Sequence, residues 1–250
     1  MGFFFKQYAL PTVAAIFAFA LAGAVCIPLK RAALEGARVG IDAGAVRASL
    51  GKGVLFGILG GYRSLVSDFV WIKSYVDWEK KDVAACAASI ELAAAIDPYM
   101  TIFWTQGASI IAFDTPYWLL EKMPRAQQGG GTLNALKAKQ AKAAMTFLDK
   151  GLGMFPSSRA LLIEKGQIAI GAEDFVTAEA CYGKVAAMPD AAVYVRRIYA
   201  SILARNGKFD KALAVLESIL PDIDKDSPAH ALILDQIKKA KELAEKSKLK

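Results

Sequence analysis

The stretch NGKFDKALAVLESILPD, residues 206–222, decides the fold because its pattern also occurs 34 residues upstream, in AEDFVTAEACYGKVAAMPD, residues 172–190. The residues that recur are an aromatic pair, Phe175 and Phe209, and a small pair, Ala178 and Ala212, and a proline closes each segment. A pattern that returns with a period of about 20 to 50 residues is typical of stacked structural repeats. A single unit of this kind cannot bury its apolar face, so neighbouring units are expected to share one core.

Apolar periodicity extends this plan upstream to residue 62. Apolar residues recur there at spacings of three and four, which predicts one apolar stripe on a helix. The stripe consists of Leu65, Phe69, Ile72 and Val76. A polar break at residues 80–82 and an alanine-rich run at residues 83–96 follow, and Pro98 ends the run. These two segments are predicted to form a first helical hairpin.

Three further units follow the first hairpin. The second pairs a helix at residues 99–113 with a helix at residues 136–154, and an insertion at 114–135 separates them. The GGG run at residues 129–131 is interpreted as a flexible hinge in this insertion. The third unit covers residues 157–189, the fourth covers 190–221, and a lysine-rich helix at 228–248 is predicted to cap the stack within residues 222–250.

The hairpins resemble the tetratricopeptide repeat (TPR) family, whose units carry small residues in both helices, an aromatic residue and a closing proline. The resemblance covers residues 62–221. The matching positions, unit by unit, are Ser74, Val83, Cys86, Ile90 and Pro98; Trp104, Ala108, Ala144, Leu148 and Pro156; Leu162, Gly166, Phe175, Ala178, Tyr182 and Pro189; and Ala200, Phe209, Ala212, Leu216 and Pro221. Lys165 and Arg196 depart from the family pattern, as does the insertion. The resemblance implies an all-α chain in which about four stacked hairpins form a TPR-like α-solenoid.

In TPR proteins the first helix of each unit lines a concave groove that holds a protein partner. Carried over residue by residue, the resemblance implies a candidate groove of Asp68, Trp71, Tyr75, Trp78, Thr105, Gln106, Ser109, Glu164, Gln167, Tyr194, Arg197, Ser201 and Arg205. The set is aromatic at one end and basic at the other, so it could hold an extended or helical peptide on aromatic anchors. The alternative is that Trp71, Tyr75 and Trp78 pack beneath residues 53–61.

The first 31 residues are predicted to be a membrane anchor. Residues 7–29 carry no charge. A helix of that length reaches about 34 Å, against a hydrocarbon core of about 30 Å. A cleaved signal peptide, with AGA at residues 22–24 as the cleavage site, is the alternative. The uncharged run is longer than a signal peptide needs, so we expect a retained single-pass helix, followed by a tether at residues 32–61.

We expect this anchor to lie in the inner membrane of a bacterium. Lys30 and Arg31 after the run outnumber Lys6 before it, which favours a cytoplasmic C-terminal part. The short basic N-terminus followed by an apolar run favours export instead. Between these two, the periplasmic side is the preferred location of the repeats.

A second, looser resemblance lies at the start of the repeats. GGYRSLVSDFVW, residues 60–71, is similar to a segment of bacterial membrane-anchored proteins in which two glycines, an aromatic residue and an arginine precede such repeats. This resemblance implies a family-specific contact by Tyr62 and Arg63. The simpler interpretation, which we favour, is the start of a helix.

The composition favours a membrane segment, and no catalytic motif is recognisable in the sequence. The chain has 250 residues, of which 55% are hydrophobic, and a mean hydropathy of +0.32, which favours a membrane segment. Its three cysteines are far apart and predict buried free thiols, while the single histidine, His230, has no partners for a triad or a metal site. No catalytic, metal or cofactor site is predicted. Because no nucleotide or cofactor motif is present, no small-molecule substrate is expected either. The net charge of +7 is diffuse and is not interleaved with aromatic residues, so no nucleic acid is expected as a partner.

These observations favour a membrane-anchored scaffold that binds a protein partner as a subunit of a larger assembly. One alternative is an accessory subunit of an enzyme, with a site in the insertion near Asp114, Tyr117, Trp118 and Glu121. The other is a peripheral lipid-binding module that uses GVLFGILGG, residues 53–61, together with Lys52 and Arg63.

Overall fold

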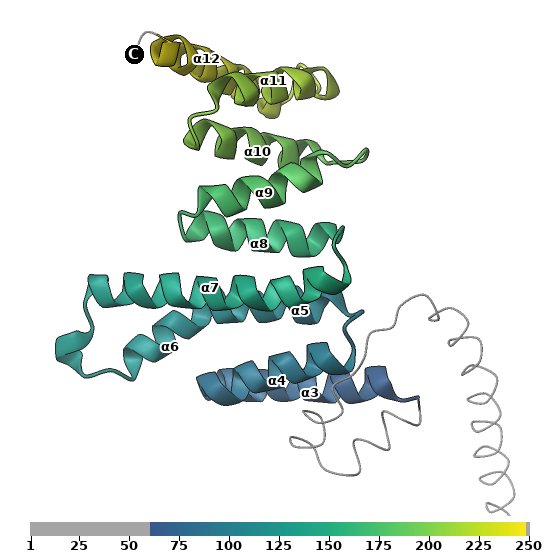
Figure 1. Ribbon diagram of the computed structural model, residues 1–250, viewed down its shortest axis with the longest axis vertical. Helices are drawn as coiled ribbons and strands as arrows, with labels where there is room; N and C mark the ends of the chain where they lie inside the picture. Colours follow the sequence, from purple (N-terminus) through teal and green to yellow (C-terminus); the bar gives the residue numbers. More distant parts are fainter. Residues whose placement is uncertain (1–60, 249–250) are drawn as a thin grey trace, which may run out of the picture.

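The computed structural model describes residues 61–248, and every regular element in this range is a helix (Figure 1). The prediction of an all-α chain is therefore confirmed for this part. The helices are α3 (Arg63–Glu79), α4 (Val83–Ile96), α5 (Thr101–Ser109), η1 (Ile110–Asp114), α6 (Thr115–Glu121), η2 (Arg125–Gln127), α7 (Gly130–Met154), α8 (Arg159–Gly171), α9 (Phe175–Ala186), α10 (Val193–Arg205), α11 (Phe209–Ile219), η3 (Leu220–Asp222) and α12 (Pro228–Lys248).

Within residues 61–248, no helix combines the length and the apolar character that crossing a membrane requires. The predicted anchor, with its uncharged run at 7–29, lies outside the described residues, as does the predicted tether apart from Gly61.

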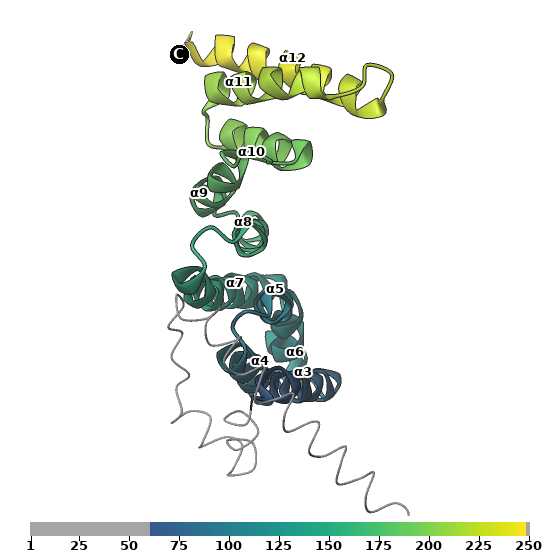
Figure 2. The ribbon, with the colours of Figure 1, turned by 90° about the vertical axis from the view of Figure 1, so that its right-hand side faces the viewer.

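The helices stack along the long axis of the molecule, from α3 and α4 at one end to α12 at the other (Figure 1). Consecutive helices pack in pairs, α3 with α4, α8 with α9 and α10 with α11, and α9 packs in turn on α10. The last helix, α12, lies along α11 (Figure 2). Its buried residues Ile233, Ile237 and Ala240 join Leu216 and Ile219 of α11 in one apolar cluster.

The turn inside each of three hairpins has the same geometry. The residue that follows the C-cap of the first helix lies in the left-handed region, with φ of 52° at Lys81, 59° at Glu173 and 73° at Gly207. The next residue in each turn donates its N–H to a carbonyl five residues back: Asp82 to Asp77, Asp174 to Ala169, and Lys208 to Leu203. This arrangement satisfies carbonyls that a helix end leaves free. Glu173 and Gly207 are 34 residues apart, the same separation as Phe175 and Phe209, at which α9 and α11 begin.

Small residues lie at the contacts between paired helices. Ala178 on α9 and Ala212 on α11 are both 0% exposed. Gly166 on α8 faces the ring of Tyr182, and a Cβ atom at residue 166 would lie 2.6 Å from Tyr182 Cδ2. The closeness of these helices therefore depends on side chains of one carbon or none.

The predicted insertion at 114–135 is a pair of helix extensions and contains no flexible hinge at its glycines. Helix α5 continues through the π-helical segment η1 into α6, so the chain is helical from Thr101 to Glu121. Pro116 in the first turn of α6 cannot donate an N–H, and the wider turn of η1 lies immediately before it. Helix α7 begins at Gly130, six residues before the predicted start, with Gly129 as its N-cap. In Figure 1, α6 and the first turns of α7 project from the side of the stack.

The predicted apolar stripe of the first helix faces outward. Its four members are between 43% and 64% exposed: Leu65, Phe69, Ile72 and Val76. The residues that α3 buries are Ser67, Val70, Trp71, Ser74 and Asp77. This face packs against the alanine-rich α4, and its polar side chains are hydrogen-bonded within the protein. Ser67 Oγ donates to Ser64 O at 2.7 Å, and Ser74 Oγ donates to Trp71 O at 2.6 Å.

Candidate partner-binding surface

The basic end of the predicted groove surrounds one pocket of about 400 Å³. Arg197, Ser201 and Arg205 follow one another at intervals of four residues, so they share one face of α10. Gln167 reaches the same pocket from α8. The complete lining is Gln167, Ile170, Phe175, Tyr182, Arg197, Ile198, Ser201, Ile202, Arg205 and Gln236. Four residues predicted from two successive units therefore come together.

Two polar atoms in this pocket have no hydrogen-bond partner. They are the hydroxyl oxygen of Tyr182, which is 0% exposed, and the side-chain oxygen Oε1 of Gln236 on α12. Burial raises the pKa of the Tyr182 hydroxyl, and the nearby Gln167 side chain by itself lowers this pKa. No group meets the geometry of a hydrogen bond to this hydroxyl, however. Gln236 is not among the predicted groove residues, and Tyr182 was predicted only as a position that matches the repeat pattern.

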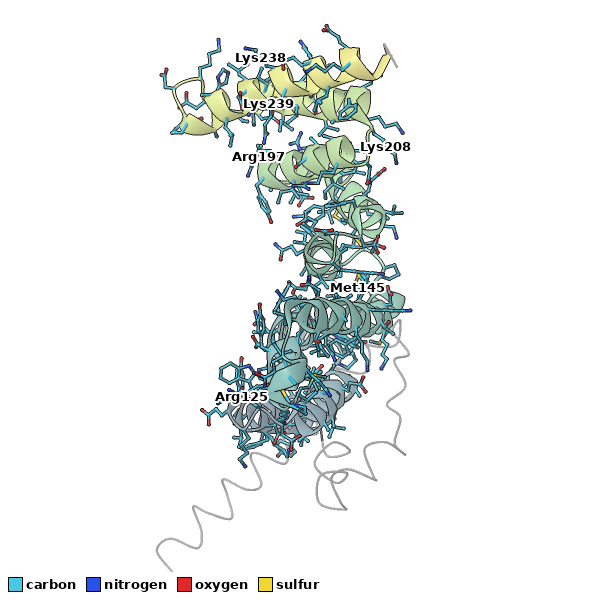
Figure 3. The ribbon with its side chains drawn as sticks, turned by 90° about the vertical axis from the view of Figure 1, so that its left-hand side faces the viewer. Arg125, Met145, Arg197, Lys208, Lys238 and Lys239 are labelled. Carbon is cyan, nitrogen blue, oxygen red and sulfur yellow. The ribbon has the colours of Figure 1, made fainter. Side chains whose placement is uncertain are left out.

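The arginines of the pocket are not engaged by carboxylates of the described residues. The guanidinium of Arg205 lies over the Phe175 ring, 5.2 Å from its centroid. The neighbouring Arg196 points elsewhere and pairs with Asp222, with 3.2 Å between Nη2 and Oδ2. Figure 3 shows Arg197 on one side of α10 and Lys208 on the other. The pocket side of α10 therefore carries positive charge that the described part of the chain does not neutralise.

The middle of the predicted groove joins two units. Ser109 Oγ at the end of α5 donates to Glu164 Oε1 on α8 at 2.7 Å. Gln106 is exposed one turn earlier on α5, and Tyr194 is exposed at the start of α10. Because Ser109 already occupies one oxygen of Glu164, this carboxylate is less available to a partner than its sequence position implied.

The aromatic end is only partly open. Asp68 and Tyr75 are exposed, but Trp71 is 8% exposed and packs on Phe103, with 5.1 Å between ring centroids. Trp71 is therefore a core residue, which corrects its place in the candidate groove. Trp78 is 39% exposed and donates from Nε1 to Asp114 Oδ2 at 2.8 Å.

The residues proposed for a site in the insertion attach α6 to its neighbours. Asp114 accepts the Trp78 hydrogen bond, and Trp118 packs edge-on against the same indole. Glu121 pairs with Lys81 at 2.5 Å, and Lys137 lies over the Tyr117 ring. Each of these side chains thus has a structural contact.

The described residues contain no group of histidine, cysteine and carboxylate side chains that could hold a metal ion. Cys86 and Cys181 are free thiols, and both are buried, as predicted. Burial is the largest effect that raises the pKa of the Cys86 thiol, to about 11. At neutral pH this thiol is therefore protonated and a poor nucleophile. Cys26 lies outside the described residues.

No protein-family model matches this chain, and no curated protein or solved structure matches it significantly.

Proposed function

We propose that the protein is a helical-repeat scaffold of the TPR type, whose hairpins at 62–221 stack into a solenoid and hold a segment of a protein partner. In this proposal residues 7–29 anchor the chain in the inner membrane, and the repeats lie on the periplasmic side. The protein would act as a subunit of a larger membrane-associated assembly.

The observation that carries the proposal is the meeting of Gln167, Arg197, Ser201 and Arg205 around one pocket. These residues come from the first helices of two successive hairpins, α8 and α10. A partner segment that crosses both helices could contact all four at once, which no isolated hairpin would allow. Ser109 and Glu164 extend the same surface toward α5 through their hydrogen bond.

Affinity capture from detergent-solubilised membranes tests this function. The full chain should recover a specific partner, and Ser201→Trp should lose it, because the indole would fill the pocket from an exposed position. Ser218→Trp, at an exposed position on α11 outside the pocket, is the matched control and should capture as well as the wild type. Equal capture by both variants, or a monodisperse monomer without a partner, would contradict the proposal.

A second candidate function is lipid contact by α3. It is favoured by the four exposed apolar residues of the α3 stripe, because a contiguous exposed apolar patch on a helix often marks a contact with a membrane or a protein. Tyr62, which is 57% exposed, precedes the stripe, and the apolar run at 53–61 comes just before it in the sequence. We therefore take a bilayer surface as the occupant in this alternative.

Amide hydrogen exchange of the full chain in anionic lipid nanodiscs tests the lipid contact. Phe69→Ser should speed exchange in α3 if Phe69 enters the bilayer surface. Val176→Ser, at a valine that is 77% exposed on α9, is the control and should leave α3 unchanged. Identical exchange of α3 in the wild type and in Phe69→Ser would exclude this function.

A further inference from the structure

Helix α3 presents an apolar face to the outside at one end of the stack (Figure 1). The α3 stripe, Leu65, Phe69, Ile72 and Val76, is 43% to 64% exposed. The helix packs on α4 with its other side, and within residues 61–248 no helix covers the stripe. An exposed apolar patch of this kind indicates a contact with another molecule.

The spacing of the stripe matches a helical partner. Its members are four, three and four residues apart, so apolar residues recur after seven: Leu65 with Ile72, and Phe69 with Val76. This is the a and d pattern of a coiled coil, in which each apolar side chain packs between residues of the facing helix. All five residues that α3 buries are at the b, c and f positions of the same heptads. The stripe therefore points away from α4 and is free to pair with a helix.

The charges beside the stripe favour a second copy of this chain as the partner. Asp68 is at the g position next to Phe69, and Lys73 is at the e position next to Ile72. In a parallel coiled coil a g residue faces the e residue that comes five positions later in the partner helix. Asp68 and Lys73 have this separation, so two copies in register bring opposite charges together. Antiparallel pairing would instead place e against e and g against g, without an opposite charge for either residue.

Both charged side chains can make this contact. Asp68 is exposed and makes no ion pair within the described part of the chain. Lys73 Nζ donates to Asp77 Oδ2 at 2.6 Å and to Ser89 Oγ at 3.2 Å, and its side chain is 57% exposed. An ammonium group has three N–H donors, so one remains for a carboxylate from outside. An anionic bilayer surface would repel Asp68, which favours a protein over lipid as the occupant.

We propose that α3 pairs with α3 of a second copy as a parallel, in-register two-stranded coiled coil. The α3 stripe forms the seam, and Asp68 of each chain pairs with Lys73 of the other in a two-fold symmetric dimer. Each helix is already folded on α4, so association does not carry the cost of forming an isolated helix. Glu79 occupies the next d position and ends the seam, so the dimer is short and reversible. Both copies of α3 begin at the same end, which agrees with the proposed anchoring of the chains in one membrane.

Disulfide cross-linking in cells that express the full chain tests the pairing and its direction. Cys26→Ser is the background, because the other two cysteines are buried. Ile72→Cys and Phe69→Cys should each form a cross-linked dimer with themselves on oxidation. Val176→Cys, at a valine that is 77% exposed on α9, is the control and should remain monomeric. Cross-links that form only when Ile72→Cys and Phe69→Cys are expressed together would show antiparallel pairing and overturn the proposal, as would the absence of any cross-link or equal cross-linking of the control.

Sedimentation equilibrium of the full chain in density-matched detergent measures the strength of the dimer. Ile72→Glu should raise the dissociation constant at least tenfold, because two carboxylates would face each other in the seam. Asp68→Lys should raise it severalfold, because it places a lysine beside Lys73 of the second copy. Val176→Glu should leave the dissociation constant unchanged. All three changes are at exposed positions, so the melting temperature of the dilute monomer should stay near that of the wild type. An unchanged dissociation constant for Ile72→Glu or for Asp68→Lys would overturn the proposed pairing.

The inference goes beyond the proposed function, because the seam is on α3 and the pocket is on α8 and α10. If a specific partner is captured but α3 does not cross-link, the scaffold function stands and the inference fails. If α3 cross-links while no partner is captured, the dimer stands and the scaffold function fails. If α3 does not cross-link and Phe69→Ser speeds its exchange in nanodiscs, a bilayer surface occupies the stripe and the inference fails.

Discussion

The ring of Tyr182 on α9 lies against the backbone of Gly166 on α8, and a Cβ atom at residue 166 would come within 2.6 Å of both Tyr182 Cδ2 and Tyr182 Cε2. Real Cβ atoms do not approach an aromatic ring this closely. Tyr182 is fully buried and cannot move aside without disturbing its neighbours. The third hairpin therefore depends on the absence of a side chain at one position.

Gly166→Ala should destabilise the protein. The overpacking cost is about 1–3 kcal/mol, which exceeds the roughly 0.5–1 kcal/mol that alanine gains over glycine within a helix. Gly153→Ala on α7 is the matched control, because its Cβ would meet nothing within 4 Å, so it should be neutral or slightly stabilising. Urea unfolding of both variants measures the difference. A stable Gly166→Ala would mean that α8 and α9 are farther apart than described.

Ala178→Leu and Ala212→Leu should each lower the free energy of unfolding by about 1–3 kcal/mol, because both alanines are 0% exposed at helix crossings. Lys211→Leu changes an exposed residue next to Ala212 and should stay within about 0.5 kcal/mol of the wild type. Thermal unfolding compares the three variants. If Ala212→Leu were neutral and Lys211→Leu destabilising, the inferred 34-residue register would be wrong by one position.

The 34-residue register could be read from the sequence because its markers are the residues that pack. Phe175 and Phe209 begin α9 and α11, and Ala178 and Ala212 fill crossings that admit only small side chains. These roles depend on the size and the hydrophobicity of the side chain, and both properties are known from the sequence.

The inner face of α3 could not be read in the same way. Hydrophobic periodicity selected Leu65 and Phe69, whereas the helix buries Ser67, Ser74 and Asp77. A polar residue can be buried when its hydrogen bonds are satisfied, and those partners come from the folded structure.

The candidate site likewise contains residues that the sequence predicts and residues that it does not. The four-residue spacing of Arg197, Ser201 and Arg205 was visible on one helix. Tyr182 and Gln236 reach the same pocket from α9 and α12, and nothing in the sequence distinguishes an unpaired buried oxygen from a paired one.

Asn206→Ala should loosen the contact between the third and fourth hairpins. Asn206 Nδ2 donates to Phe175 O at 2.9 Å and to Glu179 Oε2 at 2.7 Å, so it ties the turn after α10 to α9. Loss of both bonds should cost about 1–2 kcal/mol. Lys208→Ala, which removes only an exposed lysine from the same carboxylate, should cost less, about 0–1 kcal/mol. Chemical denaturation ranks the two variants, and the reverse order would contradict the role of the asparagine.

Asp77→Asn should lower stability at neutral pH and lose this effect in acid. Burial by itself raises the pKa of Asp77, but hydrogen bonds from Lys73 and Ser89 and the charge of Lys73 outweigh it and hold the pKa below its ordinary value of 3.8. The donors lie close to Asp77 Oδ2, with Lys73 Nζ at 2.6 Å and Ser89 Oγ at 2.8 Å. Because the folded pKa is depressed, the carboxylate stabilises the fold fully above pH 3.8 and loses this contribution as the pH falls through the folded value.

At pH 7 the substitution Asp77→Asn should therefore reduce the free energy of unfolding by about 1–3 kcal/mol, because it weakens a nearly buried charge-assisted contact between α3 and α4. Once the pH falls below the depressed folded pKa, the wild type and the variant should converge, since the wild-type carboxyl is then neutral in the folded protein. Asp68→Asn changes an exposed carboxylate on the same helix and is the control, which should stay within about 0.5 kcal/mol of the wild type at pH 7. Urea unfolding at a series of pH values measures these curves. A difference between wild type and Asp77→Asn that stays constant from neutral to acid pH would assign the effect to packing, because the two proteins share every other carboxylate and only the wild type has one at residue 77.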